Sequence, residues 1–398
     1  MLLCTHNISE KYKTMTIEAV LANHPFILHR FPLEQKNRSL QAWDAADEYL
    51  LDHIVSEYPT AQKILIFNDS FGALCCASSV IFRKEQALPT LFFVSDSFVS
   101  KAACQHNLAE NQLPTEHVTF LDSLENLPTD IDLVLIKIPK NAGFLQYQLS
   151  LLSHLPAGIP VIAAGKAKEI HTSTLKSFNH FLSEPKTSLA VKKSRLIFSK
   201  TMAKPVDSKF PISWPLENTD FTLINHANVF SRDSLDIGAR FFLNYLPAGK
   251  KPMNIIDLGC GNGVIGLQTL NRMPNCKVTF VDESAMAVAT AKQNVSHNLP
   301  ARLPDCQFVH NDCLADFEPN SADLVLCNPP FHQAQAITDH IAWQMFLQAK
   351  YTLRNGGELR IIGNRHLDYQ DKLQRLFGNC KVLGNNKKFT VLSVIKRS

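Results

Sequence analysis

The chain repeats one pattern of strands and helices in its two halves. Short runs of β-branched and aliphatic residues alternate with helical patterns on both sides of a segment rich in Pro, Ser and Lys at 202–215. This alternation is typical of parallel βαβ units. Four stretches recur in the same order: Ile64–Asp69 with Asn254–Leu258, Phe92–Asp96 with Val278–Asp282, Asn107 with Asn294, and Asp132–Leu135 with Asp323–Leu326. The sequence therefore predicts two tandem α/β domains that arose by duplication, with convergent patterning as the alternative.

These patterns divide the chain of 398 residues into four parts. We expect an N-terminal extension and entry segment at 1–32, a first domain at 33–201, a linker at 202–215 and a second domain at 216–398. Met1 to Thr14 lack the long apolar core and cleavage site of a secretory signal. No apolar run approaches the roughly 20 residues of a membrane span, so we expect no membrane association.

The cysteines favour a reducing compartment. The chain has ten of them, and they form neither a Cys-x-x-Cys pair nor a Cys/His cluster at zinc spacing. We therefore expect reduced core thiols in a cytoplasmic protein, with no metal site. The net charge of +4 is only mildly basic, so the overall charge does not by itself identify a partner.

The first strand predicted in the second half is 253–258, and a glycine-rich segment follows it. Gly259, Gly261 and Gly263 lie between this strand and a predicted helix. Ligands in open α/β sheets bind at the carboxyl ends of the strands, and glycine permits close backbone approach and positive φ. Asp257 precedes the glycines, and their spacing differs from the Gly-x-Gly-x-x-Gly of dinucleotide enzymes. The segment therefore favours a methyl donor, S-adenosyl-L-methionine, over NAD, and Asp257 is included in the predicted donor site.

Two further acids follow the next predicted strands. Asp282 ends the strand expected at 277–282, where a carboxylate can accept hydrogen bonds from both ribose hydroxyls of a cofactor. Glu283 is an alternative acceptor, and a helix N-cap is the alternative role for Asp282. Asp312 follows the strand expected at 306–311, where a carboxylate can meet an adenine amino group. For Asp312 the alternative is a cap or turn role.

The segment Asn328-Pro329-Pro330-Phe331 closes the strand expected at 322–327. A planar amino group is a poor nucleophile because its lone pair is delocalised. The side-chain oxygen of Asn328 and the carbonyl of Pro329 can accept its two hydrogens and aim the lone pair at a sulfonium methyl. Pro330 helps to fix the turn, and Phe331 offers a face for stacking a base. With the glycine segment, this predicts methylation of an exocyclic or amide nitrogen.

The first half differs from the second where the chemistry is expected. It has one glycine, Gly72, where the second half has three, and Lys137-Ile138-Pro139-Lys140 where the second has Asn-Pro-Pro-Phe. The first domain is therefore predicted to be degenerate, without cofactor binding or catalysis. Residues 151–200 hold eight Lys and Arg against two Glu, which is typical of a phosphate-tracking face, with a solvated surface as the alternative. The predicted phosphate contacts are Lys137, Lys140, Lys192 and Lys193.

These motifs together resemble a known family. The second half resembles the class I S-adenosylmethionine-dependent methyltransferases. From Leu33 onward the whole chain resembles the duplicated bacterial ribosomal RNA guanine-N2 methyltransferases, and among them the large-subunit (23S) enzymes most. Further segments that carry the resemblance are Gln41–Leu50, His226–Arg232 and Gly363–Leu367.

The resemblance implies two Rossmann-like domains, of which the second binds S-adenosyl-L-methionine and methylates the N2 of a guanine in 23S rRNA. It implies that Phe230–Gly238 lies near the cofactor, with Asp236 a candidate contact. In this interpretation the first domain is expected to hold the 23S rRNA, and no obligate protein partner is expected. A protein glutamine or DNA adenine N-methyltransferase is the alternative, since such sites share the motif, although they more often carry Tyr at the position of Phe331. An RNA-binding scaffold without activity is a third interpretation, which the intact second-half motifs disfavour.

Overall fold

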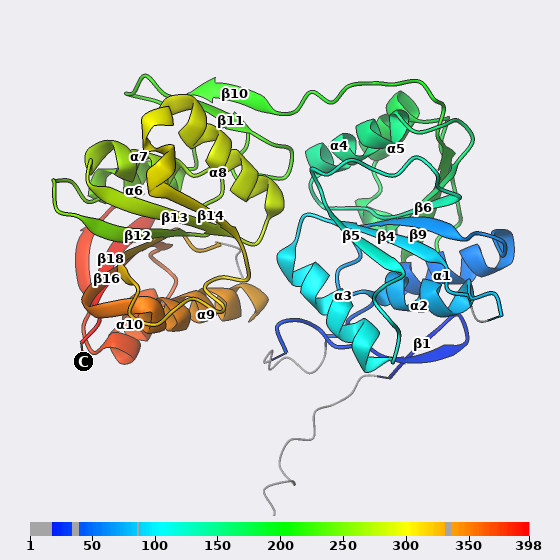
Figure 1. Cartoon of the computed structure of the whole chain (residues 1–398), viewed down its shortest axis with the longest axis horizontal. Coiled ribbons are helices and arrows are strands. Elements are labelled where there is room, and N and C mark those ends of the chain that lie inside the picture. Colours follow the sequence, from blue (N-terminus) through cyan, green and yellow to red (C-terminus); the bar gives the residue numbers. More distant parts are fainter. Residues whose placement is uncertain (1–17, 34–39, 86, 331–335, 398) are drawn as a thin grey trace, which may run out of the picture.

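The computed structural model describes residues 18–33, 40–85, 87–330 and 336–397. It contains two seven-stranded sheets, each with helices on both faces (Figure 1). In both sheets five strands are parallel and the last two pairings are antiparallel. The predicted α/β fold of two tandem Rossmann-like domains is confirmed. None of the described helices is both long enough and apolar enough to cross a membrane.

The first repeat opens with a β-hairpin and continues into a sheet of strand order β5-β4-β3-β6-β7-β9-β8. Its elements are β1 Glu18–Leu21, β2 His24–Ile27, α1 Ala45–Glu57, β3 Lys63–Phe67, α2 Ala73–Ile81, β4 Thr90–Ser95, α3 Phe98–Glu110, β5 Val118–Asp122, β6 Leu133–Lys137, α4 Ala142–Ser153, β7 Pro160–Lys166, α5 Thr172–Phe181, β8 Lys186–Thr187 and β9 Ser194–Lys200.

The second repeat has the same arrangement, with strand order β14-β13-β12-β15-β16-β18-β17. Its elements are β10 Ile212–Pro215, β11 Thr222–Asn225, α6 Ile237–Phe242, β12 Met253–Leu258, α7 Val264–Arg272, β13 Cys276–Asp282, α8 Ala285–Asn298, β14 Cys306–His310, β15 Ala322–Cys327, α9 Ala336–Thr352, β16 Leu353–Asn364, α10 Tyr369–Phe377, β17 Lys381–Asn385 and β18 Phe389–Ile395.

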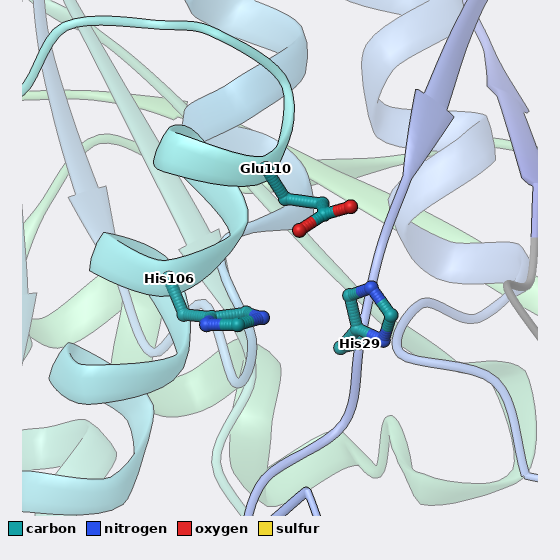
Figure 2. Close-up of side chains that lie close together, drawn as sticks. All are labelled: His29, His106 and Glu110. Carbon is teal, nitrogen blue, oxygen red and sulfur yellow. The ribbon is translucent and has the colours of Figure 1, made fainter. Parts of the chain in front are cut away.

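An asparagine fixes the hairpin to the body of each repeat. Asn107 of α3 accepts a hydrogen bond from the backbone nitrogen of His29 (2.8 Å) and donates one to its carbonyl (2.9 Å). Asn294 of α8 makes the same pair of bonds with Ile224, at 2.7 and 3.0 Å. Figure 2 shows His29 beside α3 at the first of these junctions. The pattern recurs one turn later, at Asn111 with Ile27 and at Asn298 with Thr222.

These junctions make each hairpin part of its repeat. The expected boundaries placed β1 and β2 in an entry segment at 1–32 and β10 in a linker at 202–215. In the structure β10 pairs with β11, and β11 itself contains Thr222 and Ile224, which bond the asparagines of α8. The match between Asn107 and Asn294, predicted from sequence, has the same hydrogen bonds on both sides, which strongly favours duplication over convergence.

The strand pairing shifts the expected alignment of the first strands by one residue. Ile64 pairs with Leu133, and Ile255 pairs with Leu324, in the two copies of the repeated Asp-Leu-Val-Leu segment. Ile64 therefore corresponds to Ile255 rather than to Asn254. The helices that follow begin after Gly72 and Gly263, and both of these glycines are left-handed (φ 86° and 77°).

The expected alignment of the second strands is also displaced by one residue. The helices after them are capped by Ser97 and Ser284, and each serine side chain accepts a hydrogen bond from the backbone nitrogen three residues further on. Counting back from these caps, Asp282 corresponds to Ser95, and Asp96 corresponds to Glu283. The first repeat therefore lacks a carboxylate at the position where the second repeat has its predicted ribose acid.

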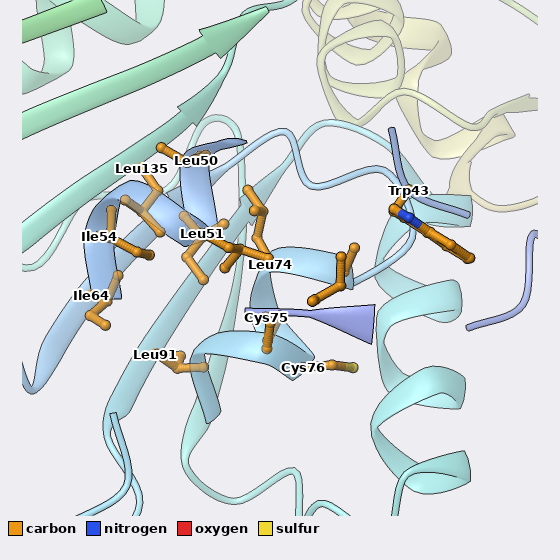
Figure 3. Close-up of a cluster of buried hydrophobic side chains, with 14 of the residues drawn as sticks. Trp43, Leu50, Leu51, Ile54, Ile64, Leu74, Cys75, Cys76, Leu91 and Leu135 are labelled. Atoms are coloured by element: carbon orange, nitrogen blue, oxygen red, sulfur yellow. The ribbon is translucent and has the colours of Figure 1, made fainter. Parts of the chain in front are cut away.

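The first repeat retains a complete hydrophobic core. Leu50, Leu51 and Ile54 of α1 pack on the sheet with Ile64 of β3 and Leu135 of β6, and all five are fully buried (Figure 3). Burying one such side chain stabilises the fold by about 1.5–3 kcal/mol. The first repeat therefore keeps the hydrophobic scaffold although it lacks the residues of the predicted active site.

Equivalent turns of the two repeats contact each other. The backbone nitrogen of Phe98 donates to the carbonyl of Glu283 (2.9 Å), and that of Ala285 donates to the carbonyl of Asp96 (2.8 Å). Phe98 corresponds to Ala285, and Asp96 corresponds to Glu283. Each turn therefore donates one backbone hydrogen bond to the other and accepts the equivalent bond from it. This is the reciprocity of a twofold dimer interface, here within one chain.

The carboxylate of Asp96 anchors this contact. It is buried and accepts hydrogen bonds from three groups of the second repeat: Ser284 Oγ (2.5 Å), Asn228 Nδ2 (2.8 Å) and the backbone nitrogen of Met286 (2.9 Å). Ser123 Oγ, from the first repeat, donates a fourth (2.5 Å). Since three of these four hydrogen bonds come from the second repeat, Asp96 fixes the orientation of the two repeats.

Candidate active site

A cavity of about 560 Å³ lies at the carboxyl edge of the second sheet. Its size is that of a small-molecule site. Its walls come from the glycine segment, the ends of β13 and β15, and the segment before α6. The predicted site residues that line it are Gly259, Gly261, Asp282, Asn328, Pro329 and Pro330. Phe331 lies outside the described residues.

The three predicted cofactor glycines have two different roles. Gly259 and Gly261 line the cavity with positive φ (70° and 54°), a conformation that other residues rarely adopt. A Cβ at Gly261 would meet no atom within 4 Å, so this backbone faces open space. Gly263 does not line the cavity. A Cβ there would lie 2.8 Å from the Cβ of Ala291, so Gly263 allows α7 to approach α8.

Asp282 ties the glycine segment to the end of β13. Its Oδ2 accepts a hydrogen bond from the backbone nitrogen of Gly261 (2.9 Å), and its Oδ1 accepts one from that of Ser284 (3.0 Å). Burial raises the pKa of this carboxyl above its ordinary value, while the two backbone donors oppose the rise. The side chain that caps α8 is Ser284, so the N-cap alternative for Asp282 does not apply.

Glu283, the alternative acceptor, lies between the repeats. Its Oε2 accepts a hydrogen bond from Ser97 Oγ (2.7 Å), and it borders the same cavity. Burial among protein atoms raises its pKa to about 7; Asp282 and Asp96 add to the rise and Ser97 opposes it. The cavity of the second repeat is thus bordered by a residue that is also bonded to the first.

Two predicted donor contacts do not line the cavity. Successive strand side chains point to opposite faces; Leu258 lines the cavity, and Asp257 points beneath α7, where its Oδ2 accepts from the backbone nitrogen of Gly266 (2.8 Å). Asp312 Oδ1 accepts from Gln344 Nε2 (3.1 Å), and the neighbouring Cys313 borders the cavity instead. The predictions of direct cofactor contact at Asp257 and Asp312 therefore differ from the structure.

Asn328 presents an unpaired acceptor. Its Nδ2 lies 3.5 Å from Asp236 Oδ2, at the outer limit of hydrogen bonding. Its Oδ1 is buried without a hydrogen-bond partner among the described residues. A buried acceptor left unpaired costs about 1–3 kcal/mol, which a ligand that donates a hydrogen would recover. Asp236, which also caps α6 through the backbone nitrogen of Ala239 (2.8 Å), lines the cavity as expected from the position of Phe230–Gly238.

Lys137 occupies the position of Asn328 in the first repeat. Its Nζ lies 2.6 Å from Asp44 Oδ1 and 2.8 Å from Asp47 Oδ1, and its side chain is only 15% exposed. Burial alone would lower the pKa of Lys137, but the two carboxylates raise it above its ordinary value. The predicted phosphate contact at Lys137 therefore differs from the structure, because Asp44 and Asp47 already neutralise its charge.

The other predicted phosphate contacts are at the surface. Lys140 is exposed and borders a second cavity of about 480 Å³ at the corresponding edge of the first sheet, as does Lys166. Lys193 is exposed and forms no ion pair with a described residue. Lys192 is 69% exposed and pairs with Glu48 (2.6 Å), a pairing of the kind that adds little energy in water. These lysines remain available to a polyanion.

Comparison with known proteins assigns each half of the chain to a protein family. The protein family described as "RLMG N-terminal domain" matches residues 17–203, and the family described as "Methyltransferase small domain" matches residues 220–393. The ribosomal RNA large subunit methyltransferase G of Pseudoalteromonas translucida is 61% identical over 385 residues, covering 96% of this chain and 99% of that protein. Those of Photobacterium profundum and Colwellia psychrerythraea are 53% and 48% identical, each covering 93% of this chain and 96% and 97% of theirs.

One solved structure shares the whole fold. It is the 16S rRNA N2 methyltransferase RsmC of T. thermophilus, in complex with AdoMet and guanosine. It superposes with a TM-score of 0.73 at 19% identity and covers 96% of this chain and 97% of its own. At this identity the likeness concerns the fold, including the tandem arrangement of the two repeats.

The buried carboxyl of Asp257 predicts a pH dependence of stability. Burial raises its pKa to about 8, against about 3.9 in an unfolded chain. Between these values the folded state holds a proton that the unfolded state releases, so stability falls as pH rises from about 4 to about 8. We expect the urea midpoint of Asp257→Asn to fall less between pH 5 and pH 9 than that of the unaltered protein.

The matched control for this measurement is Asp316→Asn, which changes an exposed carboxyl in the same repeat. It should keep the pH profile of the unaltered protein. Asp69 and Glu283, whose pKa values are also raised to about 7, contribute equally to all three proteins. An identical slope for Asp257→Asn and the unaltered protein would contradict a protonated Asp257 in the fold.

Proposed function

Because the chain belongs to the ribosomal RNA large subunit methyltransferase G family, we propose that it methylates the exocyclic N2 of one guanine in 23S rRNA. It is an S-adenosyl-L-methionine-dependent rRNA methyltransferase, and a cytoplasmic location is part of this proposal. The observation that carries the acceptor assignment is the buried, unpaired Oδ1 of Asn328 beside the glycine-lined cavity. An amino group can donate the hydrogen bond that this oxygen lacks.

The cavity has the features that S-adenosyl-L-methionine requires. The backbone of Gly261 faces open space, and a Cβ at Gly259 would lie only 3.1 Å from Met345 Cε. Asp282 stands at the strand end where ribose hydroxyls can donate to it. The bound donor supplies an electrophilic methyl group on a sulfonium. Gly259, Gly261 and Asp282 hold it, and Cys313 borders the same space.

Asn328 and Pro329 hold the acceptor nitrogen. The Oδ1 of Asn328 and the carbonyl of Pro329 accept its two hydrogens, which directs the lone pair out of the plane of the base. The same two oxygens stabilise the positive charge that develops on the nitrogen as it takes the methyl group, whose bond to sulfur breaks with the electron pair left on sulfur. No strong base is needed, because the methylated nitrogen then loses its extra proton readily to water.

Asp236 is a positioning residue in this scheme. An amide side chain can be turned by 180° with little change in shape, which would exchange Oδ1 and Nδ2 of Asn328. Because Asp236 can only accept, it favours the orientation in which Nδ2 faces Asp236 and Oδ1 faces the cavity. Lys137 and Asp44 are the counterpart in the first repeat, where Asp44 caps α1 as Asp236 caps α6. Lys137 places an ammonium group where the second repeat has the Asn328 amide, and an ammonium group cannot accept a hydrogen bond from a substrate amino group.

Variants at Asn328 and Asp236 separate chemistry from donor binding. Asn328→Ala should lower the single-turnover rate by about 100-fold or more and leave the affinity for the donor unchanged. Asp236→Asn keeps an N-cap residue but can turn the Asn328 amide around, so it should also lower the rate at unchanged donor affinity. The control is Asp220→Asn, an exposed position in the same repeat. A rate for Asp236→Asn equal to that of the control would remove the positioning role.

The first repeat supplies a basic edge for RNA. Lys166 and Lys193 lie at the same end of the β7–β9 pair, and Lys140 borders the same cavity as Lys166. The triple variant Lys140→Gln, Lys166→Gln, Lys193→Gln should weaken RNA binding and reduce the salt dependence of binding by about 0.7–0.9 for each phosphate that is no longer neutralised. Lys277→Gln, an exposed change at the opposite end of a strand in the second sheet, is the control. Equal salt slopes would exclude this edge as a phosphate-binding surface.

The state of the RNA decides whether the guanine can reach Asn328. A paired and stacked base must be flipped out before its N2 enters the cavity, at a cost of a few kcal/mol that is least for an unpaired base. We therefore expect faster tritiated methyl transfer to deproteinised 23S rRNA than to intact large subunits, both from a strain that lacks this enzyme. 16S rRNA, DNA and bulk protein are the other acceptors to compare.

Two results would contradict this account. Faster labelling of intact subunits would mean that the assembled ribosome presents the base. Preferential labelling of DNA or of protein glutamine would support the alternative N-methyltransferase interpretation and remove the 23S assignment. Nucleoside analysis of the labelled RNA should yield N2-methylguanosine.

A further inference from the structure

The first repeat has a cluster of metal-ligating side chains that methyl transfer does not use. His29 follows β2, while His106 and Glu110 lie on α3 (Figure 2). Each offers one ligand atom, and the three atoms lie within 4.8 Å of one another. We propose that His29, His106 and Glu110 bind one divalent transition-metal ion, with Zn²⁺ the best match to these ligands.

The chemistry of the ligands fits zinc. Imidazole nitrogen and carboxylate oxygen are both common zinc ligands, and bonds of about 2.0–2.2 Å require ligand atoms roughly 3.4 Å apart in a tetrahedral site. The ligand atoms all lie within 4.8 Å of one another, so each separation exceeds this value by at most about 1.4 Å, a distance that rotation of the side chains can close. His106 and Glu110 are four residues apart on α3, which places them on one face of the helix.

The backbone of the third ligand is already held against that face. Asn107, next to His106, binds both the nitrogen and the carbonyl of His29. The ring of Phe31 contacts that of His106 edge-on at 5.1 Å. None of the three ligand side chains makes a hydrogen bond or an ion pair with a described residue, so no competing partner must be displaced. Ligands held by rigid elements lose little entropy on binding.

The second repeat supplies an internal control. Its junction has the same asparagine clamp, but the positions of the three ligands are Ile224, Gln293 and His297. The clamp therefore forms without two histidines and a glutamate, and the fold of the junction does not explain them. The cluster is a property of the first repeat alone.

A bound ion would cross-link the chain after the hairpin to α3. It would stabilise the first repeat without touching the cavity of the second. Glu110 is exposed, so a fourth coordination position is open to water. The sequence motifs gave no indication of this site, because its ligands are separated by 77 residues between His29 and His106.

Zinc binding by the full-length protein tests the proposal. After removal of metals with a chelator, titration with ZnCl2 should show one ion per chain in calorimetry, and the thermal midpoint should rise. His106→Gln introduces the residue that the second repeat has at this position, and it should weaken zinc binding by at least about tenfold. Glu110→Gln should weaken it as well. His24→Gln, an exposed histidine of the same hairpin, should bind zinc as the unaltered protein does.

Two outcomes would overturn the proposal. One is absence of zinc binding at micromolar concentrations in the unaltered protein. The other is equal zinc affinity in His106→Gln, which would show that the ion binds elsewhere, for example at thiols. Circular dichroism of each variant without metal distinguishes loss of a ligand from loss of the fold, and methyl transfer should be unchanged in a correctly folded His106→Gln.

Discussion

The reciprocal contact between the turns at Asp96 and Glu283 determines how the rest of the molecule is arranged. Each turn donates a backbone hydrogen bond to the other, and the buried carboxylate of Asp96 accepts three more from the second repeat. Glu283 directly follows Asp282, which holds the glycine segment at Gly261. The first repeat is therefore bonded to the strand end that shapes the donor cavity, and it forms part of the scaffold of the active site.

The two repeats show how one scaffold gains or loses chemistry through a few side chains. Where the second repeat has Asn328 beside Asp236, the first has Lys137 between Asp44 and Asp47. The amide leaves a buried acceptor without a partner, whereas the lysine is fully paired and leaves none. Asp282 corresponds to Ser95, so the first repeat also lacks the acid that would hold a ribose. These changes are local because the hydrophobic core beneath them is intact.

The sequence predicted those features that depend on local pattern. The two α/β units, the glycine turn and the asparagine at the strand end follow from periodicity and from residue types with special backbone requirements. The predicted contact at Asp257 differs from the structure because successive side chains of a strand point to opposite faces of the sheet, and Leu258 rather than Asp257 faces the cavity. Asp312 lies in a turn after β14, where no periodicity gives the direction of a side chain.

Features that depend on distant partners were not visible in the sequence. Lys137 was expected to face RNA, but its partner Asp44 lies 93 residues earlier in the chain. Asp96 has its partners up to 190 residues away. The histidines near α3 come together only through the Asn107 junction. Such contacts arise from tertiary packing, which no local window of residues contains.

We propose that only the second repeat binds the methyl donor, through Asp282. Calorimetric titration of the full-length protein with S-adenosyl-L-methionine measures this directly, with Asp282→Ala compared with Ser95→Ala at the equivalent position of the first repeat. We predict one donor per chain, an affinity reduced about 10- to 150-fold by Asp282→Ala, which corresponds to about 1.5–3 kcal/mol for a charged hydrogen-bonding group, and no change with Ser95→Ala. Two donors per chain, or an affinity that Asp282→Ala leaves unchanged, would contradict the account.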